Sequence, residues 1–232
     1  MSKLSYTLAR LTVRIVEKIN RTYSRINQHR LTAEFRHLGS HALIESPISV
    51  MNPGCMSIGD HFIARSGVKI RAYTEFIGMQ FQPSITFGDH VHLAADVTIN
   101  CLESITIGNH SGIGVGSSIM DHMHGLPNYE DLHIPVMQRV LTSRGGVTIG
   151  DNVYVGTGVV ILAGVEIGDN CIIGSNAVVT KSIPPNSIAA GVPAKVIKTL
   201  QPPRQPLQNQ SPASTPVPKG KIHEPLRHHT VL

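Results

Sequence analysis

The chain has 232 residues, of which 4% are aromatic and 21 are Gly, and this length suits one sizeable domain with appendages. The net charge of +5 arises at the ends, because residues 37–200 hold eight basic residues against twelve acidic ones. This distribution argues against a nucleic-acid groove, which clusters positive charge and stacking aromatics on a folded face. No apolar run reaches the ~20 residues that span a bilayer, and no secretory signal is evident. Three scattered cysteines predict buried, reduced thiols in a cytosolic protein: Cys55, Cys101 and Cys171.

Residues 1–36 are predicted to form an amphipathic helical segment. Apolar side chains recur there every three or four positions, beside a parallel row of basic side chains. Such a helix packs on its own domain or on a neighbouring subunit, or it lies on an anionic membrane surface through residues 1–30. The sequence leaves both alternatives open.

A six-residue repeat over residues 149–184 decides the fold class. An aliphatic residue opens each block, and a second apolar or small residue stands four positions later. The openers are Ile149, Val155, Ile161, Ile167, Ile173 and Val179. Earlier copies open at Ile58, Ala64 and Ile70, at Phe87, Leu93 and Ile99 and, after a slip of two residues, at Ile107, Ile113 and Ile119. Period six fits neither an α-helix nor a simple strand, and it predicts an all-β parallel β-helix, which we assign to residues 37–200.

The repeat is lost between residues 119 and 149, which predicts a loop pushed out of the coil at residues 121–146. Long loops in compact folds often carry function. This one begins with Asp121-His122-Met123-His124-Gly125. A neutral imidazole can take a proton from an alcohol when a carboxylate, an amide or a carbonyl fixes its tautomer. From spacing alone, the two histidines are equally well explained as solvated loop residues.

Residues 201–232 are rich in Pro, Gln and Ser and lack a periodic apolar face. Such a segment cannot bury enough apolar surface to offset the entropy of ordering it. We therefore expect a disordered tail.

The repeat, the DHMHG sequence at its break and the ending IPPNSIAAGVPAKVIK resemble the hexapeptide-repeat acyltransferases. The resemblance covers roughly residues 55–200, and it is closest to the O-acetyltransferases of cell-surface polysaccharides and to galactoside, maltose and streptogramin acetyltransferases. It implies a left-handed coil, a homotrimer, and acetyl-CoA bound between subunits without a metal ion.

The resemblance also implies roles for individual residues. His122 matches the family's general base, whereas His124 stands where relatives often carry another residue. Asn100 is the nearest match to a polar residue beside the acceptor. The positions that match coenzyme contacts are Thr157, Gly158, Ser175, Thr180, Lys181, Lys195 and Lys198. Lysine suits the phosphates of the coenzyme because it binds phosphate as a point charge.

The expected activity is acetyl-CoA-dependent O-acetylation of a sugar in cell-surface polysaccharide biosynthesis, in the cytoplasm. Other classes stay open: a xenobiotic O-acetyltransferase, a γ-type carbonic anhydrase with a zinc site built from histidines, and a non-catalytic scaffold. Histidines available for such a zinc site include His90, His92 and His110. The acceptor depends on the shapes of residues 71–84 and 121–146, which the sequence does not specify, and the length of the acyl group is equally open.

Overall fold

The computed structural model of the chain describes residues 9–16, 18–19, 22, 26, 33–126 and 128–201. Near the N-terminus, residues 9–16, 18, 19, 22, 26, 33 and 34 are helical, so the predicted helix is present in the described part of that segment. None of the described helical residues belongs to a helix long and apolar enough to cross a membrane. The tail predicted for residues 201–232 lies outside the described residues, apart from Gln201.

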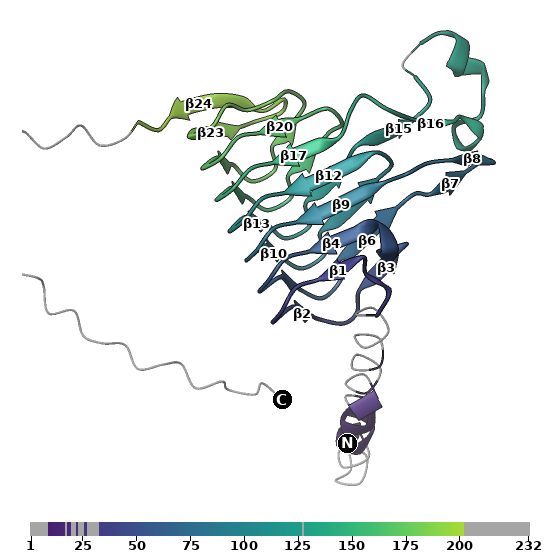
Figure 1. The fold of residues 1–232 in the computed structure, drawn as a ribbon, viewed down its shortest axis with the longest axis vertical. Coiled ribbons are helices and arrows are strands. Elements are labelled where there is room, and N and C mark those ends of the chain that lie inside the picture. Colours follow the sequence, from purple (N-terminus) through teal and green to yellow (C-terminus); the bar gives the residue numbers. More distant parts are fainter. Residues whose placement is uncertain are drawn as a thin grey trace, which may run out of the picture. The chain divides into compact units, whose positions relative to one another are not determined.

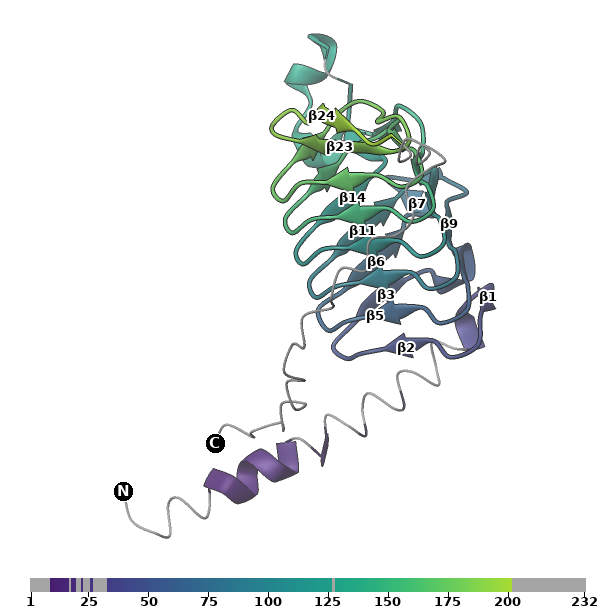
Figure 2. The same ribbon diagram turned by 90° about the vertical axis from the view of Figure 1, so that its left-hand side faces the viewer.

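Three parallel sheets form the body of the fold, and the chain enters sheets A, B and C in turn (Figure 1; Figure 2). Sheet A contains β1 (His37–Leu38), β4 (Met56–Ile58), β9 (Ser84–Phe87), β12 (Ser104–Ile107), β17 (Val147–Ile149) and β20 (Glu166–Ile167). Sheet B contains β2 (Leu43–Ile44), β5 (Ile63–Ala64), β10 (His92–Leu93), β13 (Gly112–Ile113), β18 (Tyr154–Val155), β21 (Ile172–Ile173), β23 (Ser187–Ala190) and β24 (Lys195–Thr199). Sheet C contains β3 (Ser49–Met51), β6 (Lys69–Ala72), β11 (Thr98–Cys101), β14 (Ser118–Met120), β19 (Val160–Ile161) and β22 (Val178–Val179). This is the left-handed parallel β-helix that was predicted.

Equivalent hexapeptide positions stack in register from coil to coil. Ile149 pairs with Ile107 on one side and with Ile167 on the other. All six openers of residues 149–184 are at most 1% exposed, so the predicted core is confirmed. Burying one aliphatic side chain of this size stabilises the fold by about 1.5–3 kcal/mol. Cys101 and Cys171 are buried free thiols, as predicted, whereas Cys55 is partly exposed.

Coil length varies while the register of the sheets is kept. Equivalent corner residues are 18 positions apart between Asp151 and Asp169, which is three hexapeptides, and 20 apart between Asp89 and Asn109. The same step takes 29 positions from Asp60 to Asp89 and 42 from Asn109 to Asp151. The predicted slip of two residues and the predicted break in the coil are therefore both present.

Both long steps contain an excursion at the corner where the chain passes from sheet C to sheet A, here called the C–A corner (Figure 1). The first excursion is the hairpin of β7 (Glu75–Phe76) and β8 (Met79–Gln80). The second excursion, residues 121–146, begins and ends with the antiparallel pair β15 (His122–His124) and β16 (Leu141–Ser143). The described residues also contain three 3-10 turns: η1 (Pro53–Cys55), η2 (Glu130–His133) and η3 (Val136–Gln138).

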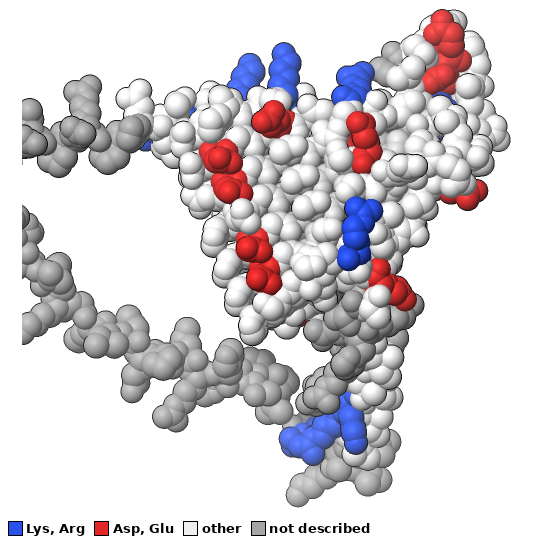
Figure 3. Space-filling model, viewed as in Figure 1, with Lys and Arg blue, Asp and Glu red and all other residues white. Residues whose placement is uncertain are grey.

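The corner between sheets A and B carries a left-handed residue in each coil. Four are histidines whose rings stack at 4.9, 4.6 and 4.8 Å: His41, His61, His90 and His110. Asn152, Asn170 and Asn186 continue the column through amide hydrogen bonds of 2.9 and 3.0 Å. Asn and His tolerate positive φ better than most residues, so these side chains serve the turn. Acidic side chains form a line along one edge of the coil (Figure 3).

The outward-facing columns of sheets A and B differ in polarity. In sheet A the column is Ser57, Thr86, Thr106, Thr148 and Glu166. In sheet B it is Leu43, Ile63, His92, Gly112, Tyr154, Ile172 and Ile188. Tyr154 is 61% exposed and Leu43 45%, although both are large and apolar in character.

Candidate active site

Asp121 is the first residue of the second excursion, and its side chain is fully buried. The carboxylate accepts hydrogen bonds from the backbone N–H groups of Leu102, Glu103 and Ser104 at 2.7, 2.8 and 2.9 Å. Burial raises the pKa of Asp121, but the hydrogen bonds from His122 and from the backbone outweigh that effect and lower it. The side chain is therefore a carboxylate at neutral pH, and it holds the C–A corner of the preceding coil together.

His122 lies beside this carboxylate, with Nδ1 at 3.0 Å from Asp121 Oδ1. An ionised carboxylate only accepts hydrogen bonds, so Nδ1 carries the proton and Nε2 of the neutral ring keeps its lone pair. The side chain is 9% exposed, and Nε2 has no hydrogen-bond partner among the described residues. A buried acid thus fixes both the tautomer and the orientation of a potential base.

His124 differs from His122 in its polar contacts. Its Nδ1 is the one buried side-chain nitrogen or oxygen without a hydrogen-bond partner in the part of the chain that the structure describes. The ring packs edge-on against Phe76, with centroids 5.4 Å apart. None of the described carboxylates hydrogen-bonds to this histidine, so the geometry distinguishes two residues that spacing alone left equivalent.

The first excursion packs against both histidines. The Tyr73 ring contacts His122 edge-on at 5.1 Å between centroids, and Phe76 makes the corresponding contact with His124. The two excursions are therefore neighbours, although the sequence separates them by about two coils. Segments 71–84 and 121–146, whose shapes the sequence does not specify, jointly enclose the histidine pair.

Asn100 lies at the end of β11, next to the same corner. Its backbone carbonyl accepts the N–H of Asp121 at 3.4 Å, which places it beside His122 in space. Arg71 stands opposite Asn100 in β6, and its Nη1 is 3.4 Å from Asn100 Oδ1. The structure thus places Asn100 at the same corner as His122 and pairs its side chain with Arg71.

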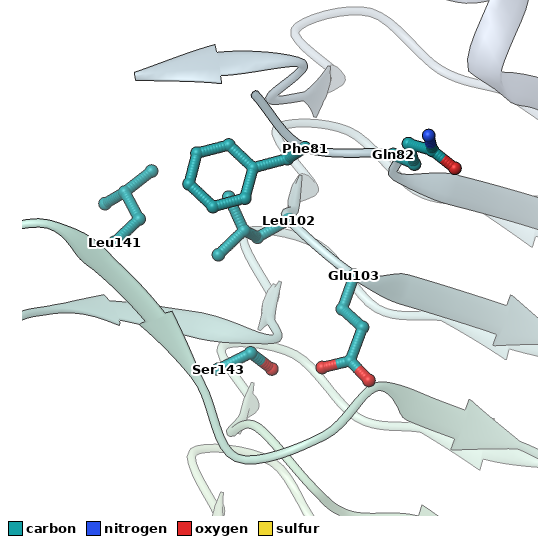
Figure 4. A pocket seen from close by; sticks show the side chains of 6 residues that line it. All are labelled: Phe81, Gln82, Leu102, Glu103, Leu141 and Ser143. Carbon is teal, nitrogen blue, oxygen red and sulfur yellow. The ribbon is translucent and has the colours of Figure 1, made fainter. Parts of the chain in front are cut away.

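A cavity of ≈ 340 Å³ lies between the returning arms of the two excursions (Figure 4). Its lining residues are Phe81, Gln82, Leu102, Glu103, Leu141 and Ser143. The Phe81 ring stands near Leu102, while the oxygens of Glu103 and Ser143 turn toward one another (Figure 4). Leu141 and Ser143 are the cross-strand partners of His124 and His122. Directly opposed residues share a face of a sheet, so the cavity adjoins the histidine pair.

The positions matched to coenzyme contacts fall into three places. Thr157, Gly158 and Ser175 lie at the corner between sheets B and C, on successive coils. Thr180 and Lys181 follow β22 at the C–A corner, and Lys195 and Lys198 are exposed on β24, which closes the coil antiparallel to β23. Sheet C separates the first place from the second. A single chain therefore does not bring Thr157, Gly158 and Ser175 to His122.

Asp121 is the functional candidate that sequence reasoning missed. Ala72 pairs with Cys101, both buried, and Asp121 takes the next place in this column, with its Oδ2 3.5 Å from the Cys101 sulfur. Asp121 occupies the repeat position that Ala72 and Cys101 occupy in earlier coils. An acidic residue at a position otherwise filled by small buried residues could have been noticed in the sequence. Arg71 and Tyr73 carried no such signal, because both follow the polarity expected of outward positions.

Comparison with known proteins agrees with this architecture. The family model for bacterial transferase hexapeptide (six repeats) matches residues 146–181. The chain is 35% identical over 160 residues to the putative lipopolysaccharide biosynthesis O-acetyl transferase WbbJ of Escherichia coli K12, covering 67% of this chain and 78% of that protein. The chain belongs to the hexapeptide-repeat acetyltransferase family. Membership favours an acetyltransferase over the carbonic-anhydrase and scaffold alternatives.

One further relative and one solved structure are also similar to this chain. Galactoside O-acetyltransferase of Escherichia coli K12 is 34% identical over 167 residues, covering 72% of this chain and 64% of that enzyme. The N-acyltransferase AntD from Bacillus cereus, solved with dTDP and 3-hydroxybutyryl-CoA, superposes with a TM-score of 0.62 at 22% identity, over 75% of this chain and 88% of that one. The second likeness concerns the fold alone.

Proposed function

We propose that this hexapeptide-repeat acetyltransferase transfers the acetyl group of acetyl-CoA to a hydroxyl of a sugar in cell-surface polysaccharide biosynthesis. The observation that carries the proposal is the buried Asp121 carboxylate that orients His122 and leaves its Nε2 available. The 35% identity to a protein described as a lipopolysaccharide O-acetyl transferase supports the acceptor class.

The reaction follows from the tautomer of His122. Nε2 takes the proton of the acceptor hydroxyl while that oxygen attacks the thioester carbonyl. The tetrahedral intermediate then collapses, the carbon–sulfur bond breaks, and the leaving sulfur takes the proton back from Nε2. Asp121 stabilises the transient imidazolium and keeps it oriented, as a positioning residue that touches neither substrate. The products are a sugar acetyl ester and free coenzyme A.

The cavity beside the histidines supports a sugar as acceptor. Phe81, Leu102 and Leu141 offer an apolar and aromatic wall for the C–H face of a pyranose ring. Glu103, Gln82 and Ser143 offer acceptors and donors for its hydroxyl groups. Asn100 would contribute a further hydrogen bond from the other side of the corner.

The coenzyme is proposed to bind between subunits of a homotrimer. One chain presents the base at its C–A corner and the coenzyme candidates Thr157, Gly158 and Ser175 at another corner. A complete site then requires the second group from a neighbouring chain. The lysines on β24 and Lys181 would meet the phosphates, where their charge is favourable.

The outer face of sheet B is the proposed subunit interface. Its outward column is mostly apolar, with His92 and Gly112 as the exceptions, whereas the column of sheet A carries hydroxyl groups and Glu166. Exposed apolar patches mark association sites in soluble proteins. The occupant is a second copy of this chain, because the coenzyme candidates and the base otherwise stay apart.

The N-terminal segment retains both of its alternatives. Leu11, Val13, Ile15 and Ile19 are at least 50% exposed in the structure. Packing on a neighbouring subunit or contact with an anionic membrane through residues 1–30 would cover them. We place the reaction in the cytoplasm, where acetyl-CoA is available. Flotation of the protein with anionic vesicles at two salt concentrations separates the alternatives, since electrostatic membrane binding weakens with salt.

The test of the activity is a panel of acceptors supplied with acetyl-CoA, with free thiol and acetyl ester both measured. We expect thiol release only with sugar acceptors. Release with a streptogramin-type xenobiotic and none with sugars would instead establish the runner-up activity. Thiol release without an acceptor would indicate hydrolysis and contradict acyl transfer to a hydroxyl.

A further inference from the structure

Arg71 is a half-buried cation beside the candidate base. It occupies the last outward position of β6 before the C–A corner. Its neighbours across the sheet are Met51 on one side and Asn100 on the other. Two positions later, Tyr73 contacts the His122 ring at 5.1 Å.

The guanidinium of Arg71 has no carboxylate partner among the described residues. Among the described residues, its side chain donates one hydrogen bond, from Nη1 to the neutral amide oxygen of Asn100 at 3.4 Å. Arg65, six residues earlier in the same coil, is paired with the carboxylate of Glu45. Partly buried arginines are usually paired, because an uncompensated charge is costly to desolvate. The charge of Arg71 is therefore left for a group that the described residues of the chain do not supply.

We propose that Arg71 binds an anionic group, a phosphate or a carboxylate, carried by the acceptor sugar. This inference rests on the proposed function and narrows its substrate class. A guanidinium presents a planar fork of donors that matches the oxygens of either group. Glu103 lies just past the same corner and lines the cavity, so it disfavours an anion there. The uncharged ring of the acceptor occupies the cavity, and its charged substituent extends toward Arg71.

The experiment compares acceptors that share one hexose ring and carry a phosphate, a carboxylate or no charged group. A hexose 1-phosphate, the corresponding uronic acid and the neutral methyl glycoside are assayed with wild type, Arg71→Gln, Arg71→Lys and the control Arg65→Gln. We expect Arg71→Gln to raise KM for a charged acceptor by about 10- to 100-fold, the effect of losing a charge-assisted hydrogen bond, with kcat nearly kept. The neutral glycoside and acetyl-CoA should keep their KM values, Arg71→Lys should recover part of the loss, and Arg65→Gln should behave as wild type.

The charged acceptor whose KM rises in Arg71→Gln shows whether Arg71 binds a phosphate or a carboxylate. An equal loss on the neutral glycoside, no loss on either charged acceptor, or a raised KM for acetyl-CoA would each overturn the proposal. Melting curves of Arg71→Gln and Arg71→Lys exclude misfolding as a cause.

A binding measurement keeps this inference separate from the proposed function. Calorimetry of the hexose 1-phosphate and the uronic acid with His122→Ala protein needs no turnover. If either sugar binds and Arg71→Gln abolishes that binding, the anion site is supported even when no acetyl transfer is found. Acetyl transfer to neutral sugars, together with unchanged binding in Arg71→Gln, upholds the function and refutes the site.

Discussion

His122 and His124 stand two residues apart on β15, and their surroundings differ in one decisive respect. A buried carboxylate orients His122, while the Nδ1 of His124 has no partner among the described residues. We expect His122→Ala to lower kcat by about 10²–10⁴-fold with little change in KM for acetyl-CoA. His124→Ala is the matched control and should keep most of its activity. The reverse pattern in steady-state kinetics would assign the base to His124.

Asp121 joins the chemistry of the site to the stability of the coil. Asp121→Asn should lower the free energy of unfolding at pH 7 by about 2–4 kcal/mol, because three backbone N–H groups lose a charged acceptor. The folded-state pKa lies below the ordinary value of 3.8, so the stabilisation is complete above that pH and is lost as the pH falls through the lowered pKa. Denaturant titrations at pH 7 and below pH 4 should therefore show the difference between wild type and variant shrink in acid. A constant difference would contradict this account.

For single residues, the sequence predicted the candidate base but not the carboxylate that orients it. Position in the repeat and family resemblance pointed to His122, because both depend on order along the chain. Tyr73 and Arg71 come from a coil that lies 49 or more positions earlier and reach the site only through sheet stacking. Local pattern carries no information on such contacts.

The coils of this fold are stacked in the same way throughout, so a substitution at one glycine can test how closely successive coils pack. A Cβ added to Gly114 would lie 2.5 Å from the Gly156 carbonyl carbon, whereas a Cβ on Gly54 would have its nearest neighbour at 3.8 Å. Gly114→Ala should cost about 1–3 kcal/mol through overpacking, and the control Gly54→Ala about 0.5 kcal/mol or less. Thermal or chemical unfolding of the two variants measures this difference in stability. Equal stability of the two variants would show that the coils can separate locally.

The strands and their burial followed from the hexapeptide period, because each opener must face a narrow interior. The excursions did not, since hairpins such as β7–β8 lie outside the period. The sequence shows where the six-residue repeat is interrupted, but it does not show that both interruptions lie at the same corner of the coil. That follows from the pairing of Phe87 with Ile107 and of Ile107 with Ile149, the residues that resume the repeat.

For the whole molecule, the decisive question is how copies associate. Tyr154 and Thr148 are outward residues of one coil, on the apolar face of sheet B and the polar face of sheet A. Tyr154→Lys should raise the dissociation constant of the trimer by about 100-fold or more, because it places a charge in the proposed apolar interface. Thr148→Lys should leave assembly unchanged. Light scattering over a dilution series measures both, and a wild-type monomer at all concentrations would refute the interface.

A shared site makes a second prediction for the assembly. His122→Ala subunits lack the base, and subunits with Lys181→Glu and Lys195→Glu lack the proposed coenzyme contacts. Each protein alone should be nearly inactive, but refolding them together should restore part of the thiol release through mixed interfaces. If mixtures stay as inactive as the separate variants, the site belongs to one chain.

Because both excursions leave the coil at one corner and return to it in register, the length of their outer parts can vary without a change in the stack beneath. The hairpin of residues 75–80 and the loop of residues 125–140, between β15 and β16, can be exchanged for segments of other lengths while Ile58, Phe87, Ile107 and Ile149 keep their partners. The coil then acts as a scaffold, and acceptor selectivity can change through the two loops alone. Chimeras that carry a relative's two loops on this coil should acquire the relative's acceptor preference and retain this protein's melting temperature.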